Sequence, residues 1–215
     1  MNAPRVVVLD WDGTVTEIDG LHMIIEEFGD RDIYAQTEDA LGRGLSLHDV
    51  IAIEMGTLTL PLGDAIDWVR EHVKVRPGFR AFAEAHRPAI LSSGFRELIE
   101  PVLEREGVEL QVIANRLDAR PDGWRAIWRD EARCAECGES CKRGGLPHDG
   151  PVVFVGDGYS DRCAALAADR VFARDGLARY LERRGVPYEP FTDFAGLARA
   201  LCPPQFDSGQ HLSHT

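Results

Sequence analysis

The sequence predicts an α/β fold in which a doubly wound parallel sheet carries a small helical cap inserted after its first strand. Short apolar, β-branched runs at 6–9, 89–91 and 152–155 are typical of strands that are buried on both faces of a parallel sheet. Segments with helical spacing separate these runs. Residues 17–75, in contrast, show helical spacing alone. The alternation therefore predicts the sheet, and the all-helical block predicts the insertion.

The elements can be placed in chain order from these patterns. After the strand at 6–9, apolar residues recur at helical spacing and predict three or four helices between about 17 and 75. The strand at 89–91 leads into a helix that opens at Phe95 and extends to about residue 106. The later elements are a strand at 110–114, a hairpin arm at 124–128, a strand at 152–155, a short helix near 164–166, a strand at 171–173, and helices at 177–184 and 194–201.

Length and charge limit what the chain can be. A chain of 215 residues suffices for one core with a modest insertion, and we expect a core of 1–16 and 76–202, a cap of 17–75 and a flexible tail of 203–215. A net charge of -12 argues against nucleic acid and against an anionic membrane as partners. No signal peptide or membrane-spanning stretch is evident, so we expect a cytoplasmic protein with reduced or metal-bound cysteines. The oligomeric state stays open.

Three predicted strands end in polar residues. These are Asp10 and Asp12 after the first, Ser92 and Ser93 after the second, and Asp157 and Asp161 after the strand at 152–155. Because the carboxyl ends of parallel strands meet at one edge of a sheet, we expect a single site there. Its oxygen ligands favour Mg²⁺, and the lack of His or Cys at these strand ends argues against zinc at this edge.

Simpler interpretations of these motifs explain less. An isolated hairpin turn at Asp12-Gly13 needs no second acid, and a calcium-binding EF-hand loop needs a glycine where Val15 stands. Ser92, Ser93 and Gly94 can form an anion cradle at the start of a helix, which indicates a phosphate substrate. Ser93 as a plain helix cap is the alternative.

These motifs, in this order and with a lysine between the last two, resemble the haloacid dehalogenase superfamily of phosphatases. The resemblance implies that Asp10 is a nucleophile that forms an aspartyl phosphate and that Asp12 is its general acid and base. It also implies that Asp10, the carbonyl of Asp12 and Asp157 hold Mg²⁺, with Asp161 in the outer shell. The phosphoryl oxygens would be held by Ser92 and Lys142.

Further segments, at 75–82, 173–176 and 185–191, together with the cysteines before Lys142, resemble the methionine-salvage phosphatases. Those enzymes act on 2-hydroxy-3-keto-5-methylthiopentenyl 1-phosphate. Phosphoserine phosphatase is a similar family with another substrate, but its cap arginine for the substrate carboxylate would fall at 52–54, where this chain has no cation. Asp19 stands where a glutamate is usual in the cap. The resemblance therefore implies a small phosphorylated metabolite, with phosphoserine as the second choice.

The chain departs from these relatives at two places. The phosphate loop reads Ser-Ser-Gly instead of Ser-Gly-Gly, so Ser93 adds a side chain near the phosphate. After Lys142, two glycines and Pro147 should shorten or break a helix, which leaves Arg143 as a second candidate phosphate ligand.

A group of cysteines offers a second candidate metal site. Cys134, Cys137, Cys141 and His148 have the ligand types of a structural zinc site that could fix the loop carrying Lys142. The alternative is three reduced thiols in a surface loop. Cys163 and Cys202 are expected to be packing residues.

Two other functional classes stay open from the residues alone. A phospho-acceptor regulatory domain also uses a strand-end Asp with Ser and Lys, and a phosphotransferase could share the aspartyl chemistry. A receiver-like domain needs neither a cap nor a second acid at the position of Asp12, so both features favour a magnesium-dependent phosphomonoesterase.

Overall fold

A computed structural model describes residues 5–201 of the chain, and these form a seven-stranded sheet in the order β4-β3-β2-β1-β5-β6-β7. All neighbouring strands are parallel except β4, which pairs antiparallel with β3. The chain order reverses at β1, between β2 and β5, and ligands of such sheets bind beyond the carboxyl ends of the strands at this reversal. The strands are β1 (Val6–Leu9), β2 (Ala89–Phe95), β3 (Val112–Asp118), β4 (Arg125–Ile127), β5 (Val152–Gly156), β6 (Arg170–Ala173) and β7 (Glu189–Pro190).

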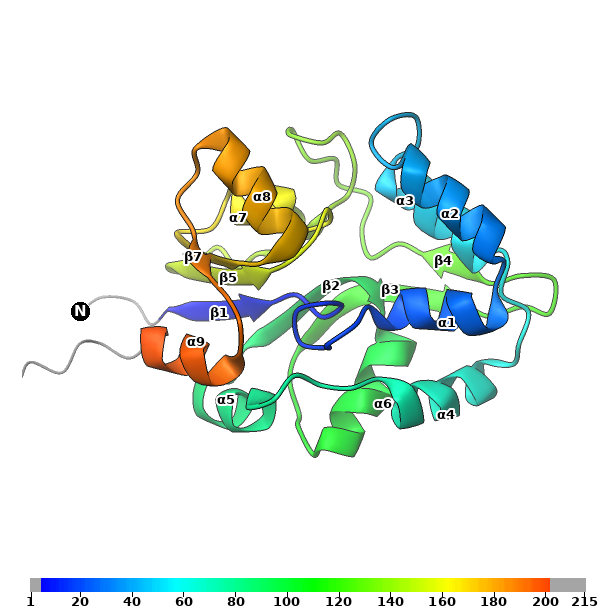
Figure 1. Cartoon of the computed structure of the whole chain (residues 1–215), viewed down its shortest axis with the longest axis horizontal. Helices are drawn as coiled ribbons and strands as arrows, with labels where there is room; N and C mark the ends of the chain where they lie inside the picture. Colours follow the sequence, from blue (N-terminus) through cyan, green and yellow to red (C-terminus); the bar gives the residue numbers. More distant parts are fainter. Residues whose placement is uncertain (1–4, 202–215) are drawn as a thin grey trace, which may run out of the picture.

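Helices cover both faces of the sheet, which confirms the doubly wound α/β fold (Figure 1). α5, α6 and α9 lie on one face, and α7 and α8 lie on the other. Within residues 5–201, no helix has both the length and the apolar character needed to cross a membrane. The helices are α1 (Gly20–Phe28), α2 (Arg31–Ala40), α3 (Leu47–Met55), α4 (Leu62–His72), α5 (Phe79–His86), α6 (Arg96–Glu106), the 3-10 turn η1 (Lys142–Gly145), α7 (Arg162–Ala165), α8 (Asp175–Arg184) and α9 (Phe194–Leu201).

The buried strands supply side chains to two hydrophobic clusters, one on each face of the sheet. On β1, Val7 and Leu9 belong to the cluster that contains the buried residues of α5, α6 and α9, whereas Val8 belongs to the cluster of α7 and α8. On β5, Val153 and Phe154 divide between the clusters in the same way. Because successive side chains of a strand point to opposite faces, a continuous apolar run is what a doubly covered strand requires.

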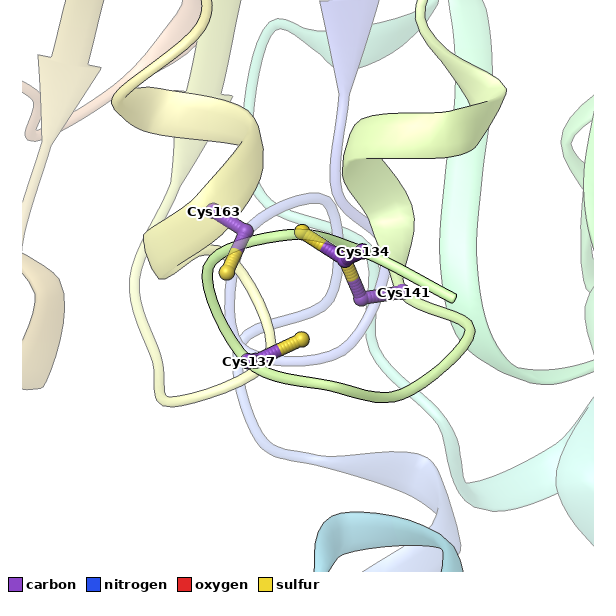
Figure 2. A group of neighbouring side chains, drawn as sticks. All are labelled: Cys134, Cys137, Cys141 and Cys163. Carbon is purple, nitrogen blue, oxygen red and sulfur yellow. The ribbon is translucent and has the colours of Figure 1, made fainter. Parts of the chain in front are cut away.

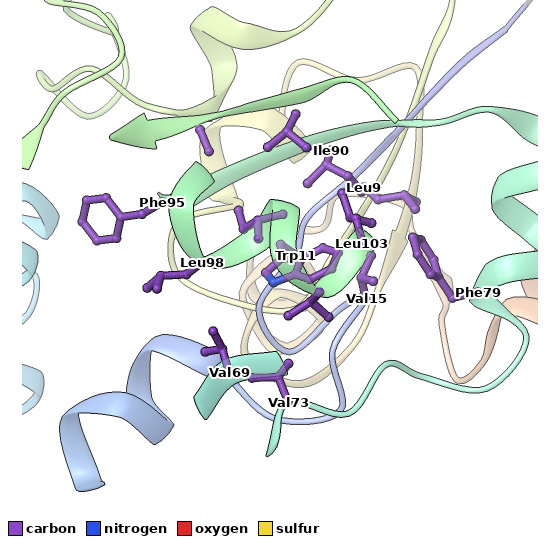
Figure 3. Close-up of a cluster of buried hydrophobic side chains, with 14 of the residues drawn as sticks. Leu9, Trp11, Val15, Val69, Val73, Phe79, Ile90, Phe95, Leu98 and Leu103 are labelled. Atoms are coloured by element: carbon purple, nitrogen blue, oxygen red, sulfur yellow. The ribbon is translucent and has the colours of Figure 1, made fainter. Parts of the chain in front are cut away.

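The segment 17–75 leaves and rejoins the sheet at one place, where Thr16 and Val75 form an isolated antiparallel bridge. It holds α1 to α4, and every residue of it is described and none belongs to a named strand. α4 packs on α6, and Val69 and Val73 share a hydrophobic cluster with Trp11 (Figure 3). Residues 17–75 thus share a hydrophobic core with the sheet. That they form a separate cap domain stays a prediction.

Some element boundaries differ from those expected from the sequence. β2 continues through Ser92–Gly94 to Phe95, so α6 begins at Arg96 and not at Phe95. The pairing of β2 with β3 is irregular between Leu91 and Phe95. β3 begins later than expected and runs to Asp118. The expected flexible tail at 203–215 lies outside the described residues.

Candidate active site

The loops after β1 and β5 and the last residues of β2 meet at one edge of the sheet, where they and the helical segment line a cavity of about 200 Å³. Asp19 lines this cavity from the segment between β1 and α1. Asp161 is fully buried and contacts Lys142, which lies in the wall. The other candidate residues that line the cavity are Asp10, Asp12, Ser92, Ser93, Gly94, Lys142 and Asp157.

The loop after β1 packs directly against Asp157. Gly13 has a φ of +76°, and a Cβ atom there would lie 2.5 Å from Oδ2 of Asp157, so both the backbone and the space require glycine. Thr14 donates its hydroxyl hydrogen to Oδ1 of Asp157 at 2.8 Å. Asp10 is 3% exposed, and its N–H donates to the carbonyl of Val155. The Asp-x-Asp-Gly-Thr motif therefore fixes one carboxylate from β1 beside one from β5.

Arg76 holds the same loop from the far end of the helical segment. Its guanidinium donates to the carbonyls of Gly13, Thr14 and Thr16 at 3.0, 3.1 and 3.2 Å. Reasoning from residue types missed this role, and Arg76 entered only within the family resemblance at 75–82. No local spacing signals it, because the contacts span about sixty residues of chain.

Lys142 lies in the wall beside the predicted nucleophile. Its side chain is 1% exposed, and its Nζ donates to the carboxylate of Asp10 and, at 2.7 Å, to Oδ1 of Asp161. Burial disfavours the ammonium, but the two carboxylates outweigh it and raise the pKa of Lys142 above its usual value. The helix after Lys142 is reduced to the single turn η1, as the glycines predicted. Arg143 is exposed, and it is not among the described residues that line the cavity.

Asp10, Asp157 and Asp161 converge so that one oxygen of each lies within 4.8 Å of the others. Burial, reinforced by Asp161, raises the pKa of Asp157 to about 6, and burial also raises the pKa of Asp10. Both oxygens of Asp161 are engaged, Oδ1 by Lys142 and Oδ2 by the N–H groups of Asp157 and Gly158 at 2.9 Å. A cluster of three acids, in which burial disfavours the charged forms of Asp10 and Asp157, fits a hard cation with oxygen ligands.

Asp12 points toward the helical segment rather than toward this cluster. Its Oδ1 accepts the N–H of Gly20 at 2.9 Å. Burial and then the charge of Asp19 raise the pKa of Asp12 well above its usual range. A Cβ atom on Gly94 would lie 3.0 Å from Oδ2 of Asp12, so this glycine leaves the carboxyl free to face the cavity. The carboxyl is thus placed and tuned to carry a proton.

The phosphate-loop residues differ from one another in their surroundings. Ser92 is buried, and its Oγ accepts the N–H of Gly94 at 2.8 Å. The carbonyl of Ser93 accepts a hydrogen bond from the side-chain amide of Asn115 at 2.8 Å. Ser93 as a helix cap is wrong, because the residue before α6 is Phe95 and it makes no side-chain capping bond.

The opposite wall comes from α1, α2 and α3 and is acidic and apolar. Burial raises the pKa of Glu54 to about 7, although the hydroxyl of Thr37 donates to its Oε1 at 2.7 Å. Burial and then Asp19 raise the pKa of Glu38. Among the described residues that line the cavity, Lys142 is the only lysine or arginine. Apolar side chains of this wall include Leu41, Leu47, Val50 and Ile51.

The cysteine group forms with a different fourth member from the one expected. Ligand atoms of Cys134, Cys137, Cys141 and Cys163 lie within 4.8 Å of one another, so Cys163 takes the place assigned to His148. His148 is exposed in a bend shortly before β5, at the amino end of that strand. The sequence suggests His148 as a member of this group and Cys163 as a residue outside it, and the structure places them the other way round. Burial opposes ionisation of Cys134, but the N–H groups of Cys137 and Glu136 lower its pKa to about 7.

Comparison with known proteins agrees with this geometry. Residues 7–166 match the family model for haloacid dehalogenase-like hydrolases. The chain is 29% identical to the 2-hydroxy-3-keto-5-methylthiopentenyl-1-phosphate phosphatase of Geobacillus kaustophilus (strain HTA426), over 94% of this chain and 97% of that one. It is 31% identical to the protein of the same name from Exiguobacterium sibiricum, over 87% and 92% of the two chains.

A crystal structure of phosphoserine phosphatase from T. onnurineus is similar with a TM-score of 0.65 and 26% identity. The match covers 91% of this chain and 93% of that one. Phosphatases are thus similar to this chain by sequence and by structure. The chain belongs to the haloacid dehalogenase-like hydrolase family, and within it the chain is a phosphoric monoester hydrolase.

Proposed function

We propose that this phosphatase transfers the phosphoryl group of a small metabolite to Asp10 and then to water. One observation carries the proposal: the Nζ of Lys142 contacts the Asp10 carboxylate at the carboxyl end of β1, within the Asp10, Asp157 and Asp161 cluster. A buried carboxylate beside a buried cation at a sheet edge is suited to nucleophilic attack on a phosphate.

The residues divide the chemistry between them. An oxygen of Asp10 attacks phosphorus, and the ester P–O bond breaks with its electron pair leaving on the substrate oxygen. Asp12, whose raised pKa favours the protonated form, donates its proton to that oxygen. The Asp12 carboxylate then accepts a proton from the water that attacks the aspartyl phosphate, which restores both residues. Lys142 and the Ser92 hydroxyl hold the phosphoryl oxygens.

Mg²⁺ is the cation that we propose for the carboxylate cluster, and it is typical of this family. The donors are oxygens only, and Asp10, the carbonyl of Asp12 and Asp157 would hold it. When bound, it supplies the positive charge that brings an anionic phosphate to an anionic carboxylate. Both carboxylate oxygens of Asp161 already accept hydrogen bonds. Asp161 is therefore suited to hold the loop after β5 in place and not to bind the ion directly.

For the leaving group we propose 2-hydroxy-3-keto-5-methylthiopentenyl 1-phosphate, the substrate named for the relatives in Geobacillus and Exiguobacterium. The wall that faces the leaving group supports a neutral, partly apolar tail, because it presents Leu41, Leu47 and Val50 beside Glu54. Phosphoserine is the second candidate, favoured by the structural similarity to a phosphoserine phosphatase. Its carboxylate would meet Glu54 and Glu38 rather than an arginine. A cytoplasmic location stays a prediction.

A substrate comparison tests this choice. With Mg²⁺ present, kcat/KM for the methylthiopentenyl phosphate should exceed that for phosphoserine by at least about 100-fold, since a desolvated like-charge contact costs several kcal/mol. Equal or better turnover of phosphoserine would reject the proposed substrate. Acid-quenched samples should carry one phosphoryl group on Asp10 by peptide mass spectrometry. Removing the divalent cation should stop turnover, and added Mg²⁺ should restore it.

A further inference from the structure

Four cysteine side chains from two separate segments point toward a common centre outside the phosphatase cavity (Figure 2). Cys134, Cys137 and Cys141 belong to the long connection between β4 and β5, and Cys163 belongs to α7. The sulfur atoms all lie within 4.8 Å of one another. None of the four lines the cavity that holds Asp10.

The mutual spacing of the sulfurs separates a metal site from disulfides. Two disulfides would need only two close sulfur pairs, whereas here all six pairs are close at once. A tetrahedral zinc site with Zn–S bonds of about 2.3 Å places its sulfurs roughly 3.8 Å apart, so only a small contraction is needed. Four thiolates in this arrangement select zinc or iron over hard cations such as Mg²⁺.

The backbone of the connection is already folded around one of these sulfurs. The N–H of Gly138 donates to the carbonyl of Cys134 at 2.8 Å, which closes a turn around the Cys-x-x-Cys pair. The N–H of Glu136 donates to Sγ of Cys134 at 3.4 Å. These hydrogen bonds hold the loop in the conformation that directs Cys134 and Cys137 toward the common centre.

Polar contacts alone hold residues 129–141 of the connection, such as the hydrogen bonds from Ser140 to Asp130 at 2.6 Å and from Arg129 to the carbonyl of Cys141 at 2.9 Å. Residues 129–141 contain no helix or strand, and all of them are described and exposed or half-buried. No hydrophobic side chain of this stretch belongs to either hydrophobic cluster. Yet the next residue, Lys142, is fully buried in the active-site wall. A polar loop of this kind needs a cross-link if it is to fix the residue that follows it.

We propose that Cys134, Cys137, Cys141 and Cys163 bind one structural zinc ion that fastens the Lys142 turn to α7. Cys141 directly precedes Lys142, and Cys163 follows Asp161 by two residues. The zinc ion therefore ties together the two backbone segments whose side chains form the Lys142–Asp161 ion pair at 2.7 Å. Its role is to position Lys142, and it stands apart from the Mg²⁺ proposed for phosphoryl transfer.

Metal analysis of the full-length protein tests the ion and its ligands. Protein purified without chelators should contain about one zinc per chain and no stoichiometric iron. Cys163→Ser should lose this zinc, whereas the matched control His148→Ala should keep it. Loss of zinc in His148→Ala with retention in Cys163→Ser would reject the ligand set. Stoichiometric iron in place of zinc would reject zinc as the bound metal.

A measurement on the unmodified chain covers the case in which Cys163→Ser does not fold. Zinc is removed under reducing conditions, Zn²⁺ is added back in competition with a chromophoric chelator, and uptake should be one equivalent per chain. Co²⁺ in its place should give the thiolate charge-transfer absorption of a tetrathiolate site. Fully reduced, folded protein that takes up no Zn²⁺ would overturn the proposal.

The positioning role has its own readout. With Mg²⁺ kept saturating, the zinc-free protein should bind inorganic phosphate about tenfold more weakly, and re-addition of Zn²⁺ should restore the inhibition constant. Unchanged phosphate affinity together with full zinc release would show that the ion does not position Lys142. Because zinc content is measured independently of turnover, failure of this inference is distinguishable from failure of the proposed phosphatase mechanism.

Discussion

The two walls of the active-site cavity are built in different ways. The sheet-edge wall holds buried charged groups whose partners are distant in sequence, as in the contacts of Lys142 with Asp10 and of Thr14 with Asp157. The opposite wall holds groups whose partners lie within the helical segment, such as Glu54 with Thr37. The sheet-edge wall is therefore fixed by the whole fold, while the polar groups of the helical wall depend on partners within their own segment.

The walls also differ in charge. Lys142 is the one lysine or arginine among the described lining residues, and it belongs to the sheet edge, where we propose that the phosphate binds. The helical wall offers the acids Glu38 and Glu54 among apolar side chains. We therefore propose that the sheet edge determines the reaction and that the helical wall selects the leaving group. Substitutions on each wall test that division.

Asp10→Asn should have the largest effect. The amide cannot act as the nucleophile, so we expect kcat to fall by at least about 10⁴-fold with any phosphate ester. Steady-state turnover of p-nitrophenyl phosphate and of the natural substrate measures this. The fold should persist, since Asn removes a buried charge, and a thermal melt checks it. Turnover within tenfold of the parent protein would reject Asp10 as the nucleophile.

Lys142→Met should weaken phosphate binding and lower kcat/KM by about 10²- to 10³-fold, because one buried donor to the phosphoryl group is lost. The inhibition constant of inorganic phosphate reports the binding part. Removing the cation leaves Asp10 and Asp161 unpaired, so stability should also fall at neutral pH. The adjacent, exposed Arg143→Met is the matched control and should leave both quantities unchanged. Larger losses in Arg143→Met than in Lys142→Met would instead identify Arg143 as the phosphate ligand.

Asp12→Asn should discriminate between leaving groups. An alkyl or enol oxygen needs a proton as it leaves, so kcat for the natural substrate should fall by about 10²- to 10⁴-fold. p-Nitrophenolate leaves without protonation, so formation of the aspartyl phosphate from its ester should be much less affected. Single-turnover release of nitrophenol separates this step from hydrolysis. An equal loss for both substrates in that step would contradict the general-acid role.

The sheet and its edge were predictable because their signals are local. A four-residue apolar run such as 6–9 predicts a strand, and acids directly after it must lie at its carboxyl end. Parallel strands then bring Asp10 and Asp157 together without any knowledge of side-chain packing. Ends of elements were less predictable, since β2 continues to Phe95 through a stretch whose pairing with β3 is irregular.

Contacts made by tertiary structure could not be predicted in this way. Arg76 reaches carbonyls about sixty residues away, and no sequence spacing encodes that distance. Nearness in sequence alone favours His148 over Cys163 as the fourth member of the cysteine group. Leu146 is buried in the cluster of α7 and α8 as the chain returns to the amino end of β5, which carries His148 away from the cysteine loop. Cys163, which follows the carboxyl end of β5, is brought back to that loop.

Leu41→Ala tests the helical wall, with a smaller expected effect. Leu41 lines the cavity and is half-buried, so its truncation should remove contact with an apolar tail and lower kcat/KM about tenfold. The inhibition constant of inorganic phosphate should stay unchanged, because phosphate alone contacts only the sheet edge. Parallel changes in both quantities would show that the two walls are not separable.

Glu54→Gln should have the smallest effect, and it should appear in stability rather than in turnover. The pKa of Glu54 is raised from 4.5 to about 7, so the folded protein binds this proton more tightly than the unfolded chain does. Stability is therefore lost as pH rises from about 4.5 through about 7, and the loss is complete above that range.

The glutamine side chain of Glu54→Gln keeps an acceptor for the hydroxyl of Thr37 but carries no charge. After allowance for solvent screening, we expect a gain of about 1–2 kcal/mol at pH near 8, or roughly 3–6 °C in Tm. The gain should vanish at acidic pH, and Glu27→Gln on the exposed side of α1 is the matched control for removal of a surface carboxylate. Melting curves across this pH range measure the difference, and a pH-independent effect would contradict the buried, proton-binding state of Glu54.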